Sequence, residues 1–297
     1  MAFALDPRKP IPKAVKKAAA EEVRKSVEGL TGQAELGPDE AAHDARKRTK
    51  KVRALLRLAR TELGDKAYRR ENRALRDSAR LLSPVRDAWV LVEALDDLVT
   101  PSDEDLSAEG VAAFRAVLTG EHRELQTGQE RDGALTRAAE AYERVLARVD
   151  RWPLQDHGWA SLDEGLEDTF RRGRRAMKRA RSNGRADDFH EWRKQVKYLR
   201  HQFGLLREVW PDVLEAMEDT ADELGERLGA DHDLAVLRER VETEQTLAPH
   251  AREALLRRID TRRKGHQRAA LALGWRLYAE KPAALRHRLG RLWNAAA

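Results

Sequence analysis

The chain of 297 residues contains no cysteine. Disulfide bonds, thiolate metal ligands and cysteine nucleophiles are therefore excluded. Glycine and proline are sparse, at 18 and 10 residues, and aromatic residues make up only 5% of the chain. The sequence has neither the apolar core of a signal peptide at its N-terminus nor the roughly 18 to 20 consecutive apolar residues of a membrane-spanning helix. We therefore expect a soluble cytoplasmic protein without a membrane partner.

Charge is abundant instead. Charged residues make up 36% and hydrophobic residues 41% of the chain, a balance that suits long amphipathic helices with ion-paired outer faces. Helical periodicity with short breaks at glycine and proline, one of them near Gly229, predicts about a dozen helices. Strands find little support, so we predict an all-α fold.

A histidine opens the same basic signature twice. The copies read HDARKRTKKVR (43–53) and HEWRKQVKYLR (190–200), and both follow H-x-x-R-K-x-x-K-x-x-R. They lie about half a chain length apart, which predicts an internal duplication with two related halves, 1–155 and 156–297. Four helices per half would bury the apolar faces economically as bundles.

Each signature places its basic residues on one stripe of a helix. In the first copy the stripe consists of His43, Arg46, Lys47, Lys50, Arg53 and Arg57, and in the second of His190, Arg193, Lys194, Lys197 and Arg200. Apolar residues occupy the opposite faces, namely Val52, Leu55, Leu56 and Ala59 in the first copy and Trp192, Val196, Leu199, Phe203 and Leu206 in the second. Like charges on one face repel by a few tenths of a kcal/mol per pair, so each stripe is interpreted as an anion-binding surface.

Helix starts and further repeats flank the signatures. Gly37–Glu40 and Asp187–Asp188 are plausible starts, which places each signature in the opening turns of its helix. Downstream, LSPVRDAWVLVEAL (82–95) parallels LGADHDLAVLRERV (228–241), so that Arg86 matches His232. Asp231 and Asp233 are interpreted as a network that orients His232. Upstream of the second signature, FRRGRRAMKRAR (170–181) is a basic helix.

Several kinds of ligand fit such stripes. A chain of phosphates offers oxygens along its whole length, and a row of long cationic side chains is its best receptor. A nucleic-acid backbone is less favoured, because neither stripe carries aromatic residues on its cationic face for base stacking. An ordinary solvated face would alternate in charge, which neither stripe does.

The two histidines leave other readings open. A metal site lacks a second ligand at i+3 or i+4 from His43 or His190. An enzyme that hydrolyses phosphate bonds or transfers phosphate through a histidine is conceivable, but no Gly-rich phosphate loop or other catalytic motif accompanies the histidines. Neighbouring cations should disfavour the protonated histidines, and a bound polyanion should favour them.

Taken together, the signatures and their surroundings resemble the CHAD (conserved histidine alpha-helical domain) family. The resemblance rests on both signatures and on the segments 68–91, 170–180, 228–237 and 270–293. It implies two pseudo-symmetric four-helix bundles whose basic faces line a central cavity or groove. It also implies a non-catalytic, stand-alone binder of inorganic polyphosphate at polyphosphate granules, without metal or cofactor, which we expect to be a monomer.

The resemblance implies which residues contact phosphate. Besides the two stripes they are Arg171, Arg174, Arg175 and Lys178, with Arg76, Arg80 and Arg86 as further contributors. His232 stands where the first half has Arg86, so the two walls are chemically unequal.

Overall fold

The structure is a computed structural model that describes residues 3–99, 108–126, 129–155 and 157–297. Within these ranges, the side chains of residues 84–87, 108–109, 126 and 129–132 are not described. Every regular element in the described ranges is a helix, which confirms the predicted all-α class.

Eleven α-helices and two short 3₁₀ turns account for the regular structure of the described residues. The elements are α1 (Ile11–Leu30), α2 (Pro38–Leu58), α3 (Arg60–Leu81), α4 (Pro84–Leu98), α5 (Ala108–Gln126), α6 (Gln129–Val149), η1 (Gly158–Ser161), α7 (Asp163–Asn183), α8 (Ala186–Leu205), η2 (Arg207–Val209), α9 (Pro211–Thr243), α10 (Pro249–Leu277) and α11 (Pro282–Ala296).

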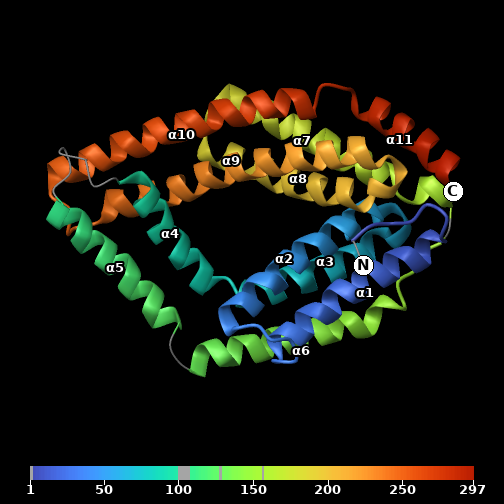
Figure 1. Ribbon diagram of the computed structural model, residues 1–297, viewed down its shortest axis with the longest axis horizontal. Helices are drawn as coiled ribbons and strands as arrows, with labels where there is room; N and C mark the ends of the chain where they lie inside the picture. Colours follow the sequence, from blue (N-terminus) through green and yellow to red (C-terminus); the bar gives the residue numbers. More distant parts are fainter. Residues whose placement is uncertain (1–2, 100–107, 127–128, 156) are drawn as a thin grey trace.

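The first half of the chain forms a bundle of α1, α2, α3 and α6. Each of these helices packs against two of the others (Figure 1). Two polar contacts pin α6 to its neighbours. Thr49 of α2 and Tyr142 of α6 share a 2.6 Å hydrogen bond, and Arg148 of α6 forms a 2.8 Å ion pair with the fully buried Glu71 of α3.

In the second half, α7 to α10 pack in sequence, and α11 lies against α7 (Figure 1). Prolines stand in the first turns of α9, α10 and α11, where a missing N–H is tolerated. The break predicted near Gly229 is wrong, because α9 runs without interruption from Pro211 to Thr243. Gly229 instead allows the side chain of Arg193 of α8 to pack closely against α9.

The two halves share one hydrophobic core. A single cluster of buried residues extends from Leu5 to Trp293. At the contact between the halves, the buried Gln202 of α8 donates to the backbone carbonyl of Ala54 of α2 at 3.4 Å. Helix α7 approaches α2 so closely that a Cβ on Gly165 would lie 2.1 Å from the carbonyl oxygen of Leu58. Because the two halves share this core, the core does not mark a boundary between them, and the predicted boundary between residues 155 and 156 stays a prediction.

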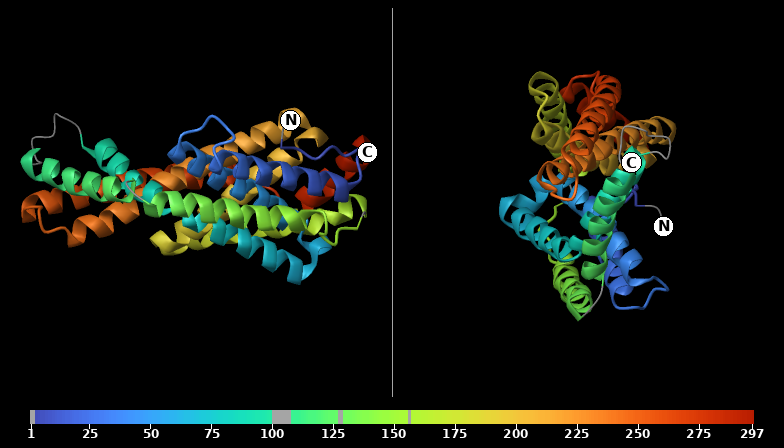
Figure 2. Two further views of the ribbon diagram at one scale, coloured as in Figure 1. Left: turned by 90° about the horizontal axis from the view of Figure 1, so that it is seen from below. Right: turned by 90° about the vertical axis from the view of Figure 1, so that its left-hand side faces the viewer.

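Helices α4 and α5 pack away from the first bundle. Their apolar residues, among them Leu95 and Phe114, join Leu237 of α9 and Ile259 of α10 in a separate small core. The predicted pseudo-symmetry is not established by this arrangement and stays a prediction, because α6 completes the first bundle in place of α4. The hairpin of α4 and α5 lies at one end of the elongated molecule (Figure 2).

Candidate functional site

Both signatures lie where the sequence predicts. Helix α2 begins at Pro38 and α8 at Ala186, each with two acidic residues in its first turn. The predicted apolar residues on the opposite faces of both helices are all fully or almost fully buried. Helix α2 then packs along α8, so the second stripe lies beside the first.

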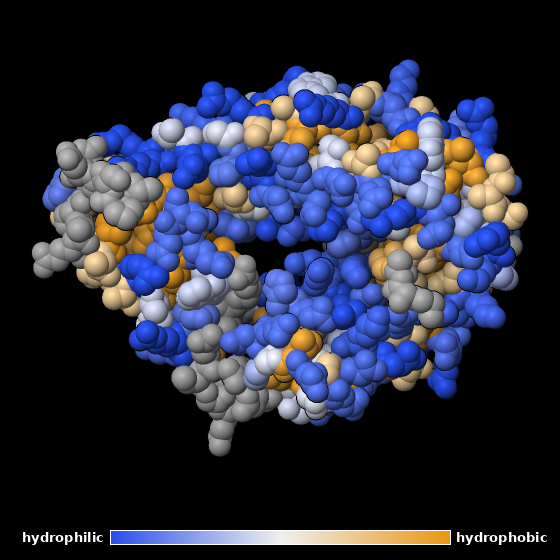
Figure 3. Space-filling model, viewed as in Figure 1, coloured by the Kyte–Doolittle hydropathy of each residue, from blue (hydrophilic) through white to orange (hydrophobic). Residues whose placement is uncertain are grey.

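A cavity of about 1070 Å³ opens between the two stripes. Three residues of the first stripe (His43, Lys47 and Lys50) and three of the second (Arg193, Lys197 and Arg200) line it. Helices α4, α9 and α10 complete its wall. The opening at the centre of the face shown in Figure 3 is bordered by hydrophilic residues. We call this space the central cavity.

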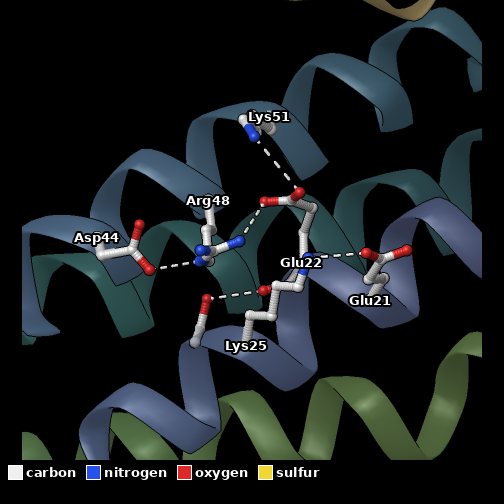
Figure 4. A network of polar contacts seen from close by, with 7 residues as sticks. Glu21, Glu22, Lys25, Asp44, Arg48 and Lys51 are labelled. Atoms are coloured by element: carbon white, nitrogen blue, oxygen red, sulfur yellow. Dashed lines mark hydrogen bonds and ion pairs between the residues drawn. The ribbon is translucent and has the colours of Figure 1, made fainter. Parts of the chain in front are cut away.

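Cations of α2 that lie off the stripe are neutralised by neighbouring acids. Arg48 pairs with Asp44 on its own helix and with Glu22 of α1 at 3.1 Å, and Lys51 pairs with Glu22 at 3.4 Å (Figure 4). Glu22 is only 5% exposed. The basic run in the sequence is therefore divided by the fold into an ion-paired side and a side that borders the cavity.

Lys197 lies where the two stripes converge on the cavity. Burial, together with Arg193 and Lys50, lowers the pKa of the Lys197 amine to about 7. Arg46 acts in the same direction, and Asp233 of α9 opposes it only in part. Because cations from both helices act on one amine, this position concentrates positive potential that an anion would relieve.

Arg193 lies against the backbone of α9. Its guanidinium Nη2 would be 3.2 Å from a Cβ placed on Gly229, so the missing side chain makes room for it. Burial lowers the pKa of Arg193, and its buried Nε has no hydrogen-bond partner among the described residues. An unsatisfied donor of this kind is costly unless a ligand completes it.

Three histidines near the cavity favour their neutral form. Burial and then Lys194 and Arg193 lower the pKa of His190, which confirms the direction expected from the sequence. His190 stacks on His232 with 4.1 Å between ring centroids, and burial and His190 lower the pKa of His232 to about 4. Burial and Arg200 lower the pKa of His201 to about 3.

Asp231 does not orient His232, contrary to the interpretation of the sequence. Its carboxylate is buried and accepts hydrogen bonds from Arg263 at 3.0 Å and Gln267 at 2.9 Å, both on α10. Asp231 therefore joins α9 to α10 through these two hydrogen bonds. His232 is positioned by the ring of His190 instead.

The wall of the central cavity is not uniformly basic. Asp222, Glu226 and Asp233 of α9 line it opposite the stripes, and α4 adds Glu93, Asp96 and Asp97. Asp222 forms a 2.6 Å ion pair with Arg200. The sequence does not indicate that these acids face the stripes, because only the packing of α4 and α9 beside α2 and α8 brings them there.

The remaining members of the first stripe, Arg46, Arg53 and Arg57, contact other parts of the protein. Arg46 donates to the carbonyl of Leu82 at 3.2 Å. Arg53 donates to Asn72 at 3.0 Å, and Arg57 covers the ring of Tyr198 with 4.0 Å from its guanidinium carbon to the ring centroid. The expectation that aromatic residues are absent from the cationic faces is therefore wrong at Tyr198, although arginine already occupies that ring.

Of the other residues expected to contact phosphate, none whose side chain is described lines the central cavity. Arg171 and Arg175 line a smaller pocket between α7 and α8, and Arg171 also forms a 2.9 Å ion pair with Asp168. Three further residues form ion pairs: Arg76 and Arg80 pair with Asp77, and Lys194 pairs with Glu191. Lys178 is exposed on α7. Arg174 is half-buried on α7, and the side chain of Arg86 lies outside the described residues.

Some residues that line the cavity are absent from the sequence-based set. His201 follows Lys197 by one helical turn, so the stripe itself could have included it. Arg262 and His266 of α10 also line the cavity, but only the packing of α10 beside α9 brings them there. In the described ranges, no group of three or more His, Cys, Asp or Glu side chains could hold a metal ion. None of the helices described is apolar enough over sufficient length to cross a membrane.

This combination defines an all-helical protein with paired cationic helices beside a charged cavity. A sequence model of the family described as "CHAD domain" matches residues 17–242, and the chain belongs to this family. The segment 270–293, which also carried the resemblance, lies beyond the matched residues. No curated protein is similar enough in sequence to be matched.

Two solved structures share the fold. "PptA from Streptomyces chartreusis" has a TM-score of 0.63 at 15% identity, with 90% of this chain and 100% of that chain covered. The CHAD domain from the plant Ricinus communis has a TM-score of 0.62 at 17% identity, with 92% and 95% covered. At these identities the likeness shows the fold alone.

Proposed function

We propose that this protein binds inorganic polyphosphate without chemically altering it. The observation that carries the proposal is the convergence of the two stripes on one cavity, where burial and then cations of α8 and α2 lower the pKa of Lys197. A chain of phosphates can place a negative charge near each of these side chains in turn. Charge-assisted hydrogen bonds and the release of counterions would then drive binding.

The proposal concerns a polyanion and not a single phosphate. The cavity is large, and the stripe continues past it along α2 to Arg53 and Arg57. Nucleic acid is the weaker candidate because Tyr198, the aromatic ring beside the first stripe, is already covered by Arg57. Within a cell, such a protein would be located at polyphosphate granules.

Removal of two cations of the first stripe tests this assignment. Arg46→Gln combined with Lys50→Gln should weaken polyphosphate binding more than tenfold and make the salt dependence shallower by roughly two units of log–log slope. The matched control is Lys264→Gln with Arg268→Gln, which removes the same charge from exposed positions on α10 that do not line the cavity. Unchanged affinity in the stripe variant, measured by titration calorimetry, would refute the assignment.

The non-catalytic part of the proposal has its own test. Incubation of polyphosphate with the protein should release no orthophosphate above the level of a protein-free sample. Release that His43→Ala or His190→Ala abolishes would instead establish an enzyme that works through a histidine.

A further inference from the structure

A second basic pocket lies on the outer side of α10. It has a volume of about 640 Å³, and its polar wall consists of Arg227 of α9 and of Arg257, Arg258, Thr261, Arg262 and His266 of α10. We call it the α10 pocket. All of α10 lies beyond the residues that the family model matches.

The pocket follows from a third cationic stripe in the sequence. In RRIDTRRKGH (257–266), Arg258, Arg262 and His266 are spaced by one helical turn and share a face of α10. Arg263 points elsewhere and is neutralised by the buried Asp231. Lys264 and Arg268 are exposed and do not line the pocket. The fold therefore collects one subset of these cations in the pocket.

The charge of the α10 pocket differs from that of the central cavity. Among the described residues that line it there is no carboxylate, whereas six carboxylates line the central cavity. Two arginines of the pocket pair with acids on their own helices, since Arg257 contacts Glu253 at 2.7 Å and Arg227 contacts Glu223 at 3.6 Å. Exposed ion pairs of this kind contribute little, so phosphate oxygens can replace them.

The two spaces adjoin each other. Leu98, Arg262 and His266 line both the central cavity and the α10 pocket. Arg262 is exposed and donates to the carbonyl of Asp97 at 3.1 Å, which fixes it at the border between α4 and α10. From Arg258 to His266 the stripe extends on the order of 12 Å along the helix, enough for several phosphate units.

We propose that the α10 pocket is a second subsite for polyphosphate, which receives the part of a long chain that extends out of the central cavity past Arg262. This inference rests on the proposed function. Its ligand is a flexible chain of phosphates without bases, since the pocket offers guanidinium groups, an imidazole and a hydroxyl but no aromatic platform among its described lining. The protein should therefore discriminate between short and long chains.

The experiment compares long-chain polyphosphate with tripolyphosphate on the full chain. Arg257→Gln with Arg258→Gln should weaken the binding of the long chain about tenfold or more and change tripolyphosphate affinity less than twofold, because both residues line the α10 pocket and not the central cavity. This variant also keeps the bond from Arg262 to Asp97. Arg258→Gln with Arg262→Gln should weaken the binding of the long chain at least as much, with a smaller loss for tripolyphosphate, because Arg262 lines both spaces. The control with Lys264→Gln and Arg268→Gln should affect neither ligand.

Three results would overturn the inference, and they have different meanings. An unchanged affinity for the long chain in both α10 variants would show that the pocket is not used. An equal loss for both ligands would show that the α10 cations act only on the potential of the central cavity. If the unsubstituted protein binds neither ligand, the proposed function itself fails, and the subsite fails with it.

Discussion

Polyphosphate binding should weaken as the pH rises above about 7, because Lys197 must be protonated to bind an anion. Burial, Arg193 and Lys50 lower the pKa of this amine from 10.5 to about 7 in the free protein. Phosphates in the cavity would favour the charged form and raise the pKa again. Between about pH 7 and 10, the complex should therefore hold up to one proton more than the free protein, and affinity should fall by up to about tenfold per pH unit.

The assay is calorimetric titration with polyphosphate at several pH values between 6.5 and 9, in pairs of buffers that differ in ionisation enthalpy. The difference between buffers gives the number of protons taken up on binding. Lys197→Arg should bind with little pH dependence in this range, because arginine stays charged. Lys197→Gln should bind weakly throughout, also without the slope. A slope in Lys197→Arg equal to that of the unsubstituted protein would refute the reasoning.

Substitutions at three glycines give further predictions. Gly165→Ala should destabilise the fold by about 1–3 kcal/mol or more, because its Cβ would meet the carbonyl oxygen of Leu58. Gly265→Ala, which has open space around it, should be neutral or slightly stabilising. Thermal unfolding compares the two variants, and equal melting temperatures would contradict the close contact of α2 and α7. Gly229→Ala should weaken polyphosphate binding severalfold with little change in melting temperature, because it displaces the Arg193 guanidinium by a few tenths of an ångström. Unchanged affinity in a calorimetric titration of this variant would contradict the role of Arg193.

Much of the local structure could be predicted from periodicity. The starts of α2 and α8 follow from residues suited to a first helical turn, namely Pro38 and the acidic pairs. The burial of their apolar faces follows from apolar residues that recur every three or four positions. The all-α class followed in the same way. Local rules were less reliable at Gly229, where a glycine typical of a helix end serves close packing inside a continuous helix.

The composition of the cavity could not be predicted in the same way. Whether a cation borders the cavity or faces an acid of a neighbouring helix depends on the helix that packs beside it. Lys51 lies one position from Lys50 in the signature, yet Glu22 of α1 pairs with it. The acids of α9 reach the cavity only because α8 and α9 are neighbours, and α4 leaves the first bundle because its apolar face fits α9.

Binding of inorganic polyphosphate in competition with single-stranded RNA tests the central claim most directly. The titration is made at about 150 mM salt, near physiological ionic strength, while released orthophosphate is monitored. The account predicts binding that is selective for polyphosphate and releases no orthophosphate. Preference for RNA at equal salt, or steady release of orthophosphate, would contradict it.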